Sequence, residues 1–226
     1  MTLPLRPLAV ALSLLALGAP AMAQTATTDA PAATPAEVQT LPDIVLGQAD
    51  APLTIVEYAS FTCPHCRDFH NENFATLKSE YIDTGKVKFI QRDVYFDQFG
   101  LWAGIVARCG GDTKYYAMSD MLFSQQKEWM NAKTEADFAA NLRKIGKSAG
   151  MTEPQLDACF ADEGKVKQMI ATFQKNAEAD QIKGTPTFII GGEQVANQEW
   201  SKLKAKIDEK YAEAAAAAPA APAATN

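Results

Sequence analysis

Apolar residues in the first half of the chain follow two different spacings. Residues 53–59 and 87–91 are short runs rich in β-branched side chains, which is typical of strands. Between them, Phe74, Leu77 and Tyr81 recur at helical intervals, and Pro64 is suited to the first turn of a helix. This part of the chain therefore predicts a strand, a helix and a second strand.

The pattern from residue 97 to residue 181 is helical throughout. It predicts helices at 99–109, 113–124, 135–149 and 164–179, with a short turn at 153–160. Apolar stripes mark two of these helices, formed by Phe138, Leu142 and Ile145 in one and by Val166, Met169, Ile170, Phe173 and Ala177 in the other.

Strand character returns after this helical block. Residues 187–190 and 193–195 flank Gly191 and Gly192, which is the spacing of a β-hairpin with a two-residue turn. A final amphipathic helix is expected to bury Trp200, Leu203, Ile207 and Tyr211. The order of elements predicts an α/β domain whose halves, 43–96 and 182–212, are separated by a helical insertion at 97–181.

The two ends of the chain differ from this middle. Residues 1–23 combine Arg6, an apolar run and a small-x-small triplet, which is typical of a cleaved secretory signal. Residues 24–42 and 213–226 are rich in alanine, proline and threonine, so we expect a disordered linker and a disordered tail. The mature protein is expected to be soluble and extracytoplasmic, where disulfides persist.

Charge excludes one class of partner. The 21 basic and 27 acidic side chains give a net charge of -6, so the chain has no polycationic surface for phosphate backbones. Nucleic-acid binding is therefore not expected.

The strongest candidate for chemistry is Cys63-Pro64-His65-Cys66. A Cys-x-x-Cys between a strand and a helix places the first sulfur at the positive end of the helix dipole, which stabilises a thiolate. Cys63 is therefore expected to be the nucleophile and Cys66 the resolving thiol. His65 can donate a hydrogen bond or positive charge to the Cys63 thiolate, which makes the disulfide a better oxidant.

Several interpretations of Cys63, Cys66 and their neighbours His70 and Glu57 remain open. A Cys-x-x-Cys can be half of a zinc site, with His70 as a third ligand, although the chain has no second ligand pair. His70 is otherwise an ordinary surface or packing residue. Glu57 interrupts an apolar strand: it is either a buried carboxylate that manages the proton of Cys66 or an exposed position on an edge strand.

Cys109 and Cys159 both fall in the helical block. In an oxidising compartment they are expected to form a structural disulfide, closing a loop for which the chain-entropy argument gives about 4 kcal/mol. Two free buried thiols are the alternative.

Two motifs together resemble the DsbA family of secreted thiol-disulfide oxidoreductases. They are residues 57–66, which contain Cys63-Pro64-His65-Cys66, and residues 184–188, Gly-Thr-Pro-Thr-Phe. The resemblance covers about residues 43–211 and implies a thioredoxin fold with an inserted helical domain. It also implies that Glu57 is the buried carboxylate, that Pro186 follows a cis peptide bond, and that the Thr185 backbone pairs with an extended substrate beside Cys63.

The resemblance implies a periplasmic oxidase that needs no metal or organic cofactor. Its partners would be unfolded secreted proteins that contain cysteines and a quinone-coupled membrane reoxidant of the DsbB type, and a monomer is expected. Thr185 is a departure, because the founding oxidase has valine there and threonine also occurs in isomerase and reductase relatives. An isomerase or reductase, and a non-catalytic chaperone or metal carrier, are therefore the alternatives.

Overall fold

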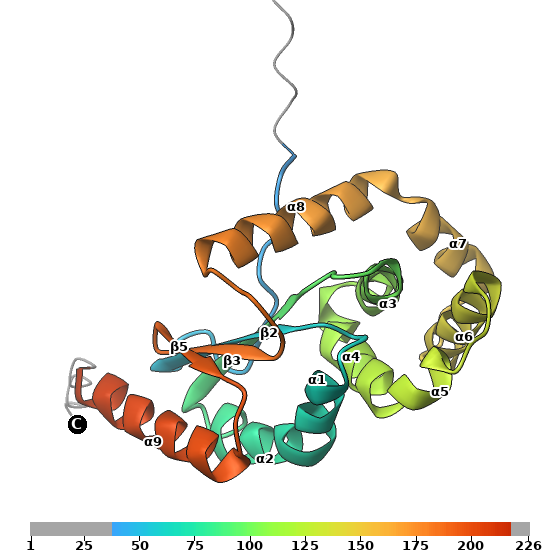
Figure 1. Cartoon of the computed structure of the whole chain (residues 1–226). Coiled ribbons are helices and arrows are strands. Elements are labelled where there is room, and N and C mark those ends of the chain that lie inside the picture. Colours follow the sequence, from blue (N-terminus) through green and yellow to red (C-terminus); the bar gives the residue numbers. More distant parts are fainter. Residues whose placement is uncertain (1–37, 218–226) are drawn as a thin grey trace, which may run out of the picture. The chain divides into compact units, whose positions relative to one another are not determined.

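The fold is built on a mixed five-stranded sheet, seen near the centre of Figure 1. The computed structural model describes residues 38–217, so the predicted signal at 1–23 lies outside the described residues. The strands are β1 (Val45–Leu46), β2 (Leu53–Ala59), β3 (Val87–Asp93), β4 (Thr187–Ile190) and β5 (Glu193–Ala196), in the order β1-β3-β2-β4-β5. β2 pairs with β3 in parallel, and the other pairs are antiparallel. β2 is thus the central strand.

Both faces of the central strand are covered. Leu53 and Ile55 pack into one apolar cluster with Phe69 and with Leu203 of α9 (Trp200–Ala217). Val56 and Tyr58 point to the other face, where Phe173 of α8 (Glu163–Ala179) packs. A strand buried on both faces reads as a nearly continuous apolar run. This explains why Leu53–Ala59 shows little of the alternation of a half-exposed strand.

The predicted hairpin and the predicted helix after the first long strand are both present in the structure. Gly191 and Gly192 connect β4 to β5 with φ values of 57° and 87°. Positive φ at both positions is the requirement of a tight hairpin turn that matches the twist of the strands. The helix after β2 is α1 (Pro64–Phe69), continued by a π-helical turn η1 (His70–Phe74), then α2 (Ala75–Leu77) and a second π-helical turn η2 (Lys78–Ile82).

Two predictions about the ends were wrong in extent. Helix α9 (Trp200–Ala217) runs past residue 213, where the tail was expected to begin, because alanine has the highest helix propensity and Ala214 packs against the core. At the other end, residues 38–42 belong to the described fold: the backbone N–H of Leu41 donates to Thr172 Oγ1 over 2.7 Å, and Ile44 is buried.

The helical insertion follows β3 and returns to the sheet at β4. Its helices are α3 (Gln98–Cys109), the 3-10 turn η3 (Asp112–Lys114), α4 (Tyr115–Ser124), α5 (Gln126–Met130), α6 (Glu135–Ser148), α7 (Glu153–Ala161) and α8 (Glu163–Ala179). Figure 1 shows α8 crossing one face of the sheet, with α1, α2 and α9 on the other. The chain therefore has a thioredoxin fold with a helical insertion.

The segment at 153–160 is a helix rather than a short turn. Thr152 and Gln155 form a capping box, in which each side chain bonds the other residue's backbone N–H. This satisfies the first free N–H groups of a nine-residue helix. The β1 strand and α5 were not predicted, because two and five residues are too short to show a period.

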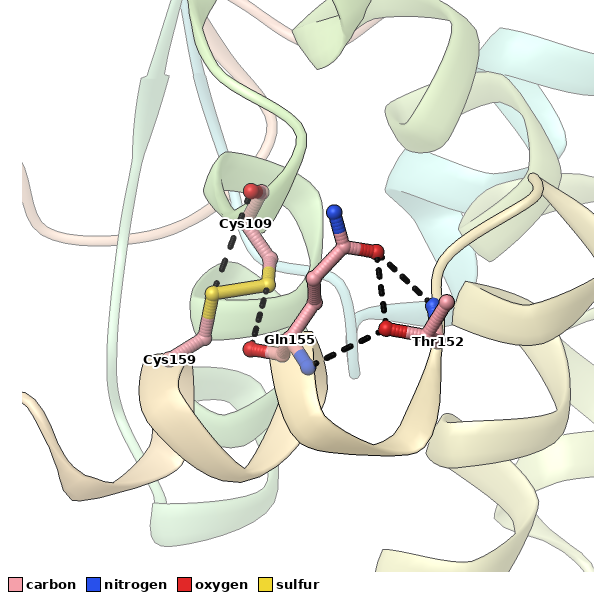
Figure 2. Close-up of a disulfide and its surroundings, with 4 residues drawn as sticks. All are labelled: Cys109, Thr152, Gln155 and Cys159. Atoms are coloured by element: carbon pink, nitrogen blue, oxygen red, sulfur yellow. Dashed lines mark hydrogen bonds between the residues drawn. A yellow bond between two sulfur atoms is a disulfide. The ribbon is translucent and has the colours of Figure 1, made fainter.

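A disulfide fastens α7 to the end of α3. Cys109 and Cys159 are joined at 2.00 Å, as expected from the sequence, and their sequence separation is 50. Figure 2 shows the bridge beside the capping box, with Cys109 Sγ 3.6 Å from the carbonyl oxygen of Gln155. The disulfide therefore closes the loop that contains α4, α5 and α6.

A buried charge cluster fastens the insertion to the sheet. Asp93, the last residue of β3, accepts hydrogen bonds from Arg108 Nε over 3.0 Å and from the hydroxyl of Tyr115. The hydroxyl of Tyr95 and the side-chain amide of Gln91 also donate to it, over 3.1 Å and 3.2 Å. Asp93 thus joins β3 to both α3 and α4.

No helix among residues 38–217 is both long enough and apolar enough to cross a membrane.

Candidate active site

Cys63 and Cys66 lie where β2 gives way to α1. Cys63 is the N-cap residue of the helix and Pro64 occupies the first turn, where the missing N–H of proline costs no hydrogen bond. Cys63 is half-buried, Cys66 is fully buried, and His65 is exposed between them. An incoming thiol therefore meets Cys63 first.

The two thiols differ in their electrostatics. A hydrogen bond from Cys66, with others from Thr185 and from the backbone at the helix start, lowers the pKa of Cys63 to about 5 although burial opposes the shift. Burial raises the pKa of Cys66 far above its ordinary value, and the charge of Glu57 adds to the rise. At neutral pH the reduced pair therefore consists of one thiolate and one thiol.

A second segment comes from the far end of the chain. The Thr185–Pro186 peptide bond is cis, as the resemblance implied. The carbonyl oxygen of Thr185 lies 3.4 Å from Cys63 Sγ, although the two residues are 122 positions apart. The structure thus brings both motifs into one site.

Glu57 is buried rather than exposed on an edge strand. It lies on the central strand, paired with Gln91 of β3 and Phe188 of β4, and its side chain has no exposed surface. Its Oε2 atom is 2.9 Å from Nε2 of His70, whereas Oε1 is a buried atom with no hydrogen-bond partner among the described residues.

Of the two interpretations of His70 as a surface or a packing residue, the surface position was wrong and the packing position is confirmed. His70 is buried, and its ring stacks on Phe123 and Phe74 at centroid distances of 4.1 Å and 4.8 Å. Its spacing of four residues from Cys66 was the available signal, because it puts both on one helix face. Nothing in the described part of the chain gathers three metal-ligating side chains, so the zinc reading has no support from the geometry.

Sequence reasoning also missed Gln126. This buried residue of α5 donates its side-chain amide to the carbonyl oxygens of Phe61 and Cys63 over 2.7 Å and 2.9 Å. The helical insertion therefore holds the backbone of the Cys63 loop directly. A glutamine in a short helix has no sequence pattern that marks such a contact.

Comparisons with known proteins agree with this arrangement. The thioredoxin family profile matches residues 39–209. A Rickettsia bellii protein with the provisional name protein-disulfide oxidoreductase is 33% identical over 172 residues, which cover 76% of this chain and 65% of the relative. Disulfide bond formation protein D of Bacillus subtilis is 26% identical, over 74% of this chain and 76% of that protein.

Solved structures give the same result. The crystal structure of alpha-DsbA1 from Wolbachia pipientis has a TM-score of 0.70 and 25% identity, and the match covers 79% of this chain and 96% of that one. The chain spans less than two thirds of the Rickettsia relatives, between 61% and 65% of their length. The profile match over most of the chain, with the DsbA-like neighbours, shows that the chain belongs to the thioredoxin superfamily and, within it, to the DsbA family.

Proposed function

We propose that this chain is a periplasmic thiol:disulfide oxidoreductase that introduces disulfides into secreted proteins. A substrate thiolate attacks Cys63 of the Cys63–Cys66 disulfide, and a mixed disulfide forms as Cys66 leaves. The second substrate cysteine then displaces Cys63. The substrate gains a disulfide and loses two electrons, which remain on the enzyme as the Cys63 thiolate and the Cys66 thiol.

One observation carries this proposal: the half-buried sulfur of Cys63 has a pKa of about 5, whereas the buried Cys66 remains a thiol. A thiolate that is stable at neutral pH is a good leaving group, so the mixed disulfide at Cys63 is released readily toward the substrate. Stabilisation of the reduced form also makes the disulfide more oxidising.

Substrate contact is proposed at the Thr185–Pro186 segment. Thr185 lies against Cys63, and an extended chain that pairs with its backbone would bring a substrate cysteine to the exposed side of the sulfur. Proposed substrates are unfolded secreted proteins that contain cysteines. Reoxidation is proposed to come from a quinone-coupled membrane protein of the DsbB type.

The mechanism is tested with two single variants. Cys63→Ser should abolish oxidation of a reduced, unfolded substrate, whereas Cys66→Ser should accumulate a mixed disulfide visible on a non-reducing gel. Cys109→Ser, combined with Cys159→Ser, is the control and should keep the exchange activity. Retained turnover in Cys63→Ser would refute the mechanism.

The direction of the reaction is tested by the reduction potential. The lowered pKa of Cys63, to which Cys66 contributes most, supports the oxidase. Threonine at position 185 keeps the reductase or isomerase as a second candidate. Equilibration with glutathione buffers should give a potential above about -180 mV for an oxidase, whereas about -270 mV would indicate a reductase.

A further inference from the structure

The proposed exchange cycle requires a proton to reach and leave a buried sulfur. When the disulfide takes two electrons from a substrate dithiol, one substrate proton ends on Cys66 and the other is released, because Cys63 remains a thiolate. Reoxidation returns the Cys66 proton to solvent as its sulfur attacks a mixed disulfide at Cys63. Cys66 has no exposed surface, so this proton needs a route.

Glu57 and His70 are two buried polar groups that can form such a route. Cys66 and His70 are four residues apart on the helix that begins at Pro64, so their side chains are neighbours on one helix face. Glu57 reaches His70 from the central strand: its Oε2 is 2.9 Å from His70 Nε2, and its Oε1 has no hydrogen-bond partner among residues 38–217. The charge of Glu57 also acts on the Cys66 thiol, and a carboxylate oxygen without a donor can accept a proton.

His70 connects the buried carboxylate to an open pocket. The pocket has a volume of about 500 Å³ and is lined by His70 and by exposed residues of two elements, among them Asn71, Ala117 and Asp120. Its lining includes neither Cys63 nor Thr185. His70 has two ring nitrogens, and Nδ1 makes no hydrogen bond with residues 38–217, so it is free to exchange a proton with pocket water.

The other polar groups around His70 are already engaged or lie at the pocket opening. The Tyr116 hydroxyl of α4 donates to the carbonyl oxygen of Ile44 over 2.7 Å, and Lys78 of η2 pairs with Asp83 over 2.7 Å. Asp120 of α4 is exposed. Phe74 and Phe123 hold the imidazole from both sides, which fixes its ring plane but supplies no proton.

We propose that His70 is a positioning and proton-transfer residue that passes the Cys66 proton between Glu57 and the pocket lined by Asn71, Ala117 and Asp120. Its imidazole takes the proton from Glu57 at Nε2 and releases one at Nδ1, and the reverse occurs during reduction. The inference rests on the proposed function, since it concerns the step in which Cys66 reacts.

One stopped-flow experiment separates the two cysteines. Reduced protein is mixed with Ellman's reagent: Cys63 attacks first and releases one thionitrobenzoate, and Cys66 then resolves the mixed disulfide, releasing a second thionitrobenzoate and its proton. His70→Ala should leave the first phase unchanged and slow the second phase about 100-fold, the lower end of the range for general acid-base catalysis.

Two additions make the result specific to proton transfer. Imidazole added to His70→Ala should restore the second phase in proportion to its concentration, because it can enter from the pocket, and should not accelerate the wild type. His70→Gln keeps a donor toward Glu57 but cannot relay a proton, so it should be as slow as His70→Ala. Lys78→Gln, which changes a residue that lines the same pocket but pairs with Asp83 and not with His70, is the control and should resolve at the wild-type rate.

The outcomes are distinct. A missing first phase in the wild type would refute the proposed function itself. A normal second phase in His70→Gln, or a slow phase in His70→Ala that imidazole leaves unchanged, would overturn the relay and leave His70 a structural residue. His70→Ala should also add no further slowing to Glu57→Gln, because residues of one relay are not additive.

Discussion

Glu57 and Asp93 are two buried carboxylates on adjacent parallel strands, and they are held in opposite ways. Asp93 accepts hydrogen bonds from four donors and faces the guanidinium of Arg108. Among the described residues Glu57 has one hydrogen-bond partner, His70, and one carboxylate oxygen without a partner. The two carboxylates are close neighbours in the sheet. Glu57 pairs with Gln91 of β3, and Asp93 lies two residues further along that strand, where it accepts a hydrogen bond from the Gln91 side chain.

The difference separates a structural carboxylate from a reactive one. Asp93 accepts two of its four hydrogen bonds from Arg108 and Tyr115 of the helical insertion. Its charge also raises the pKa values of Tyr95 and Tyr115, after the larger effect of burial, so both remain donors. Glu57 keeps a site that can accept a proton. Complete satisfaction stabilises a buried acid, whereas incomplete satisfaction leaves it able to react.

The largest expected loss of stability follows from replacing Asp93, the structural carboxylate. Asp93→Asn removes the charge opposite Arg108, whose side chain is 12% exposed, and breaking a buried ion pair costs about 3–5 kcal/mol. Urea unfolding of the oxidised protein measures this loss. Asp43→Asn is the matched control: its pair with Arg92 is partly exposed, so the loss should stay below about 1 kcal/mol. Equal losses in the two variants would break the comparison.

The second largest loss of stability is expected from removing the disulfide. Replacing Cys109 and Cys159 together by alanine should lower the free energy of unfolding by about 2–4 kcal/mol, because the bridge spans 50 residues of sequence and restricts the unfolded chain. The two phases of the Ellman reaction should keep their wild-type rates. A slowed Cys66 phase would show that the insertion's stability and the redox site are coupled.

Glu57→Gln should affect rate more than stability. The substitution keeps the shape and removes a charge that has a single partner, so the free energy of unfolding should change by less than about 1 kcal/mol. The Cys66 phase should nevertheless be slowed, because the amide cannot accept the proton. A stability loss as large as that of Asp93→Asn would place Glu57 among the structural acids.

The smallest effect is expected at Cys63 in the Asp93→Asn variant. Thiolate absorbance of the reduced wild type should titrate with a midpoint near pH 5, and Asp93→Asn should not move it, because the groups that lower this pKa are Cys66, Thr185 and the helix backbone.

The same thiolate makes the stability of the reduced protein depend on pH. The pKa of Cys63 in the folded protein lies below the unfolded value of 9.0, so the thiolate stabilises the reduced protein fully above pH 9 and loses that effect as pH falls through 5. Unfolding of the reduced protein at several pH values checks the sign, and the oxidised protein, which lacks the thiolate, is the control.

The sequence predicted the features that have a local signal. The helix start at Pro64, the Gly191–Gly192 turn, and the order of strands and helices all depend on residues close together in the chain. The cis bond at Pro186 came from the resemblance to a family, not from spacing. Periodicity also indicated which helices of the insertion carry an apolar face.

What the sequence could not show depends on contacts between distant residues. The burial of Glu57 is decided by β4, which adds to the sheet about 130 residues later and turns β2 into a central strand. The packing of His70 depends on Phe123 of α4, whose ring stacks on the imidazole from 53 residues further along the chain. Gln126 reaches the Cys63 loop through α5, a helix too short for any period to predict.

The contact between Cys63 and Thr185 has a consequence for the order of events during synthesis. The two residues are 122 positions apart, so most of the chain is made before Thr185 can reach the sulfur. Until β4 joins the sheet, Cys63 lacks the hydrogen bond from Thr185 that helps to lower its pKa and is closer to an ordinary thiol. The reactivity of Cys63 is thus timed by the topology: the nucleophile matures only after Cys109 and Cys159 have both been added to the chain.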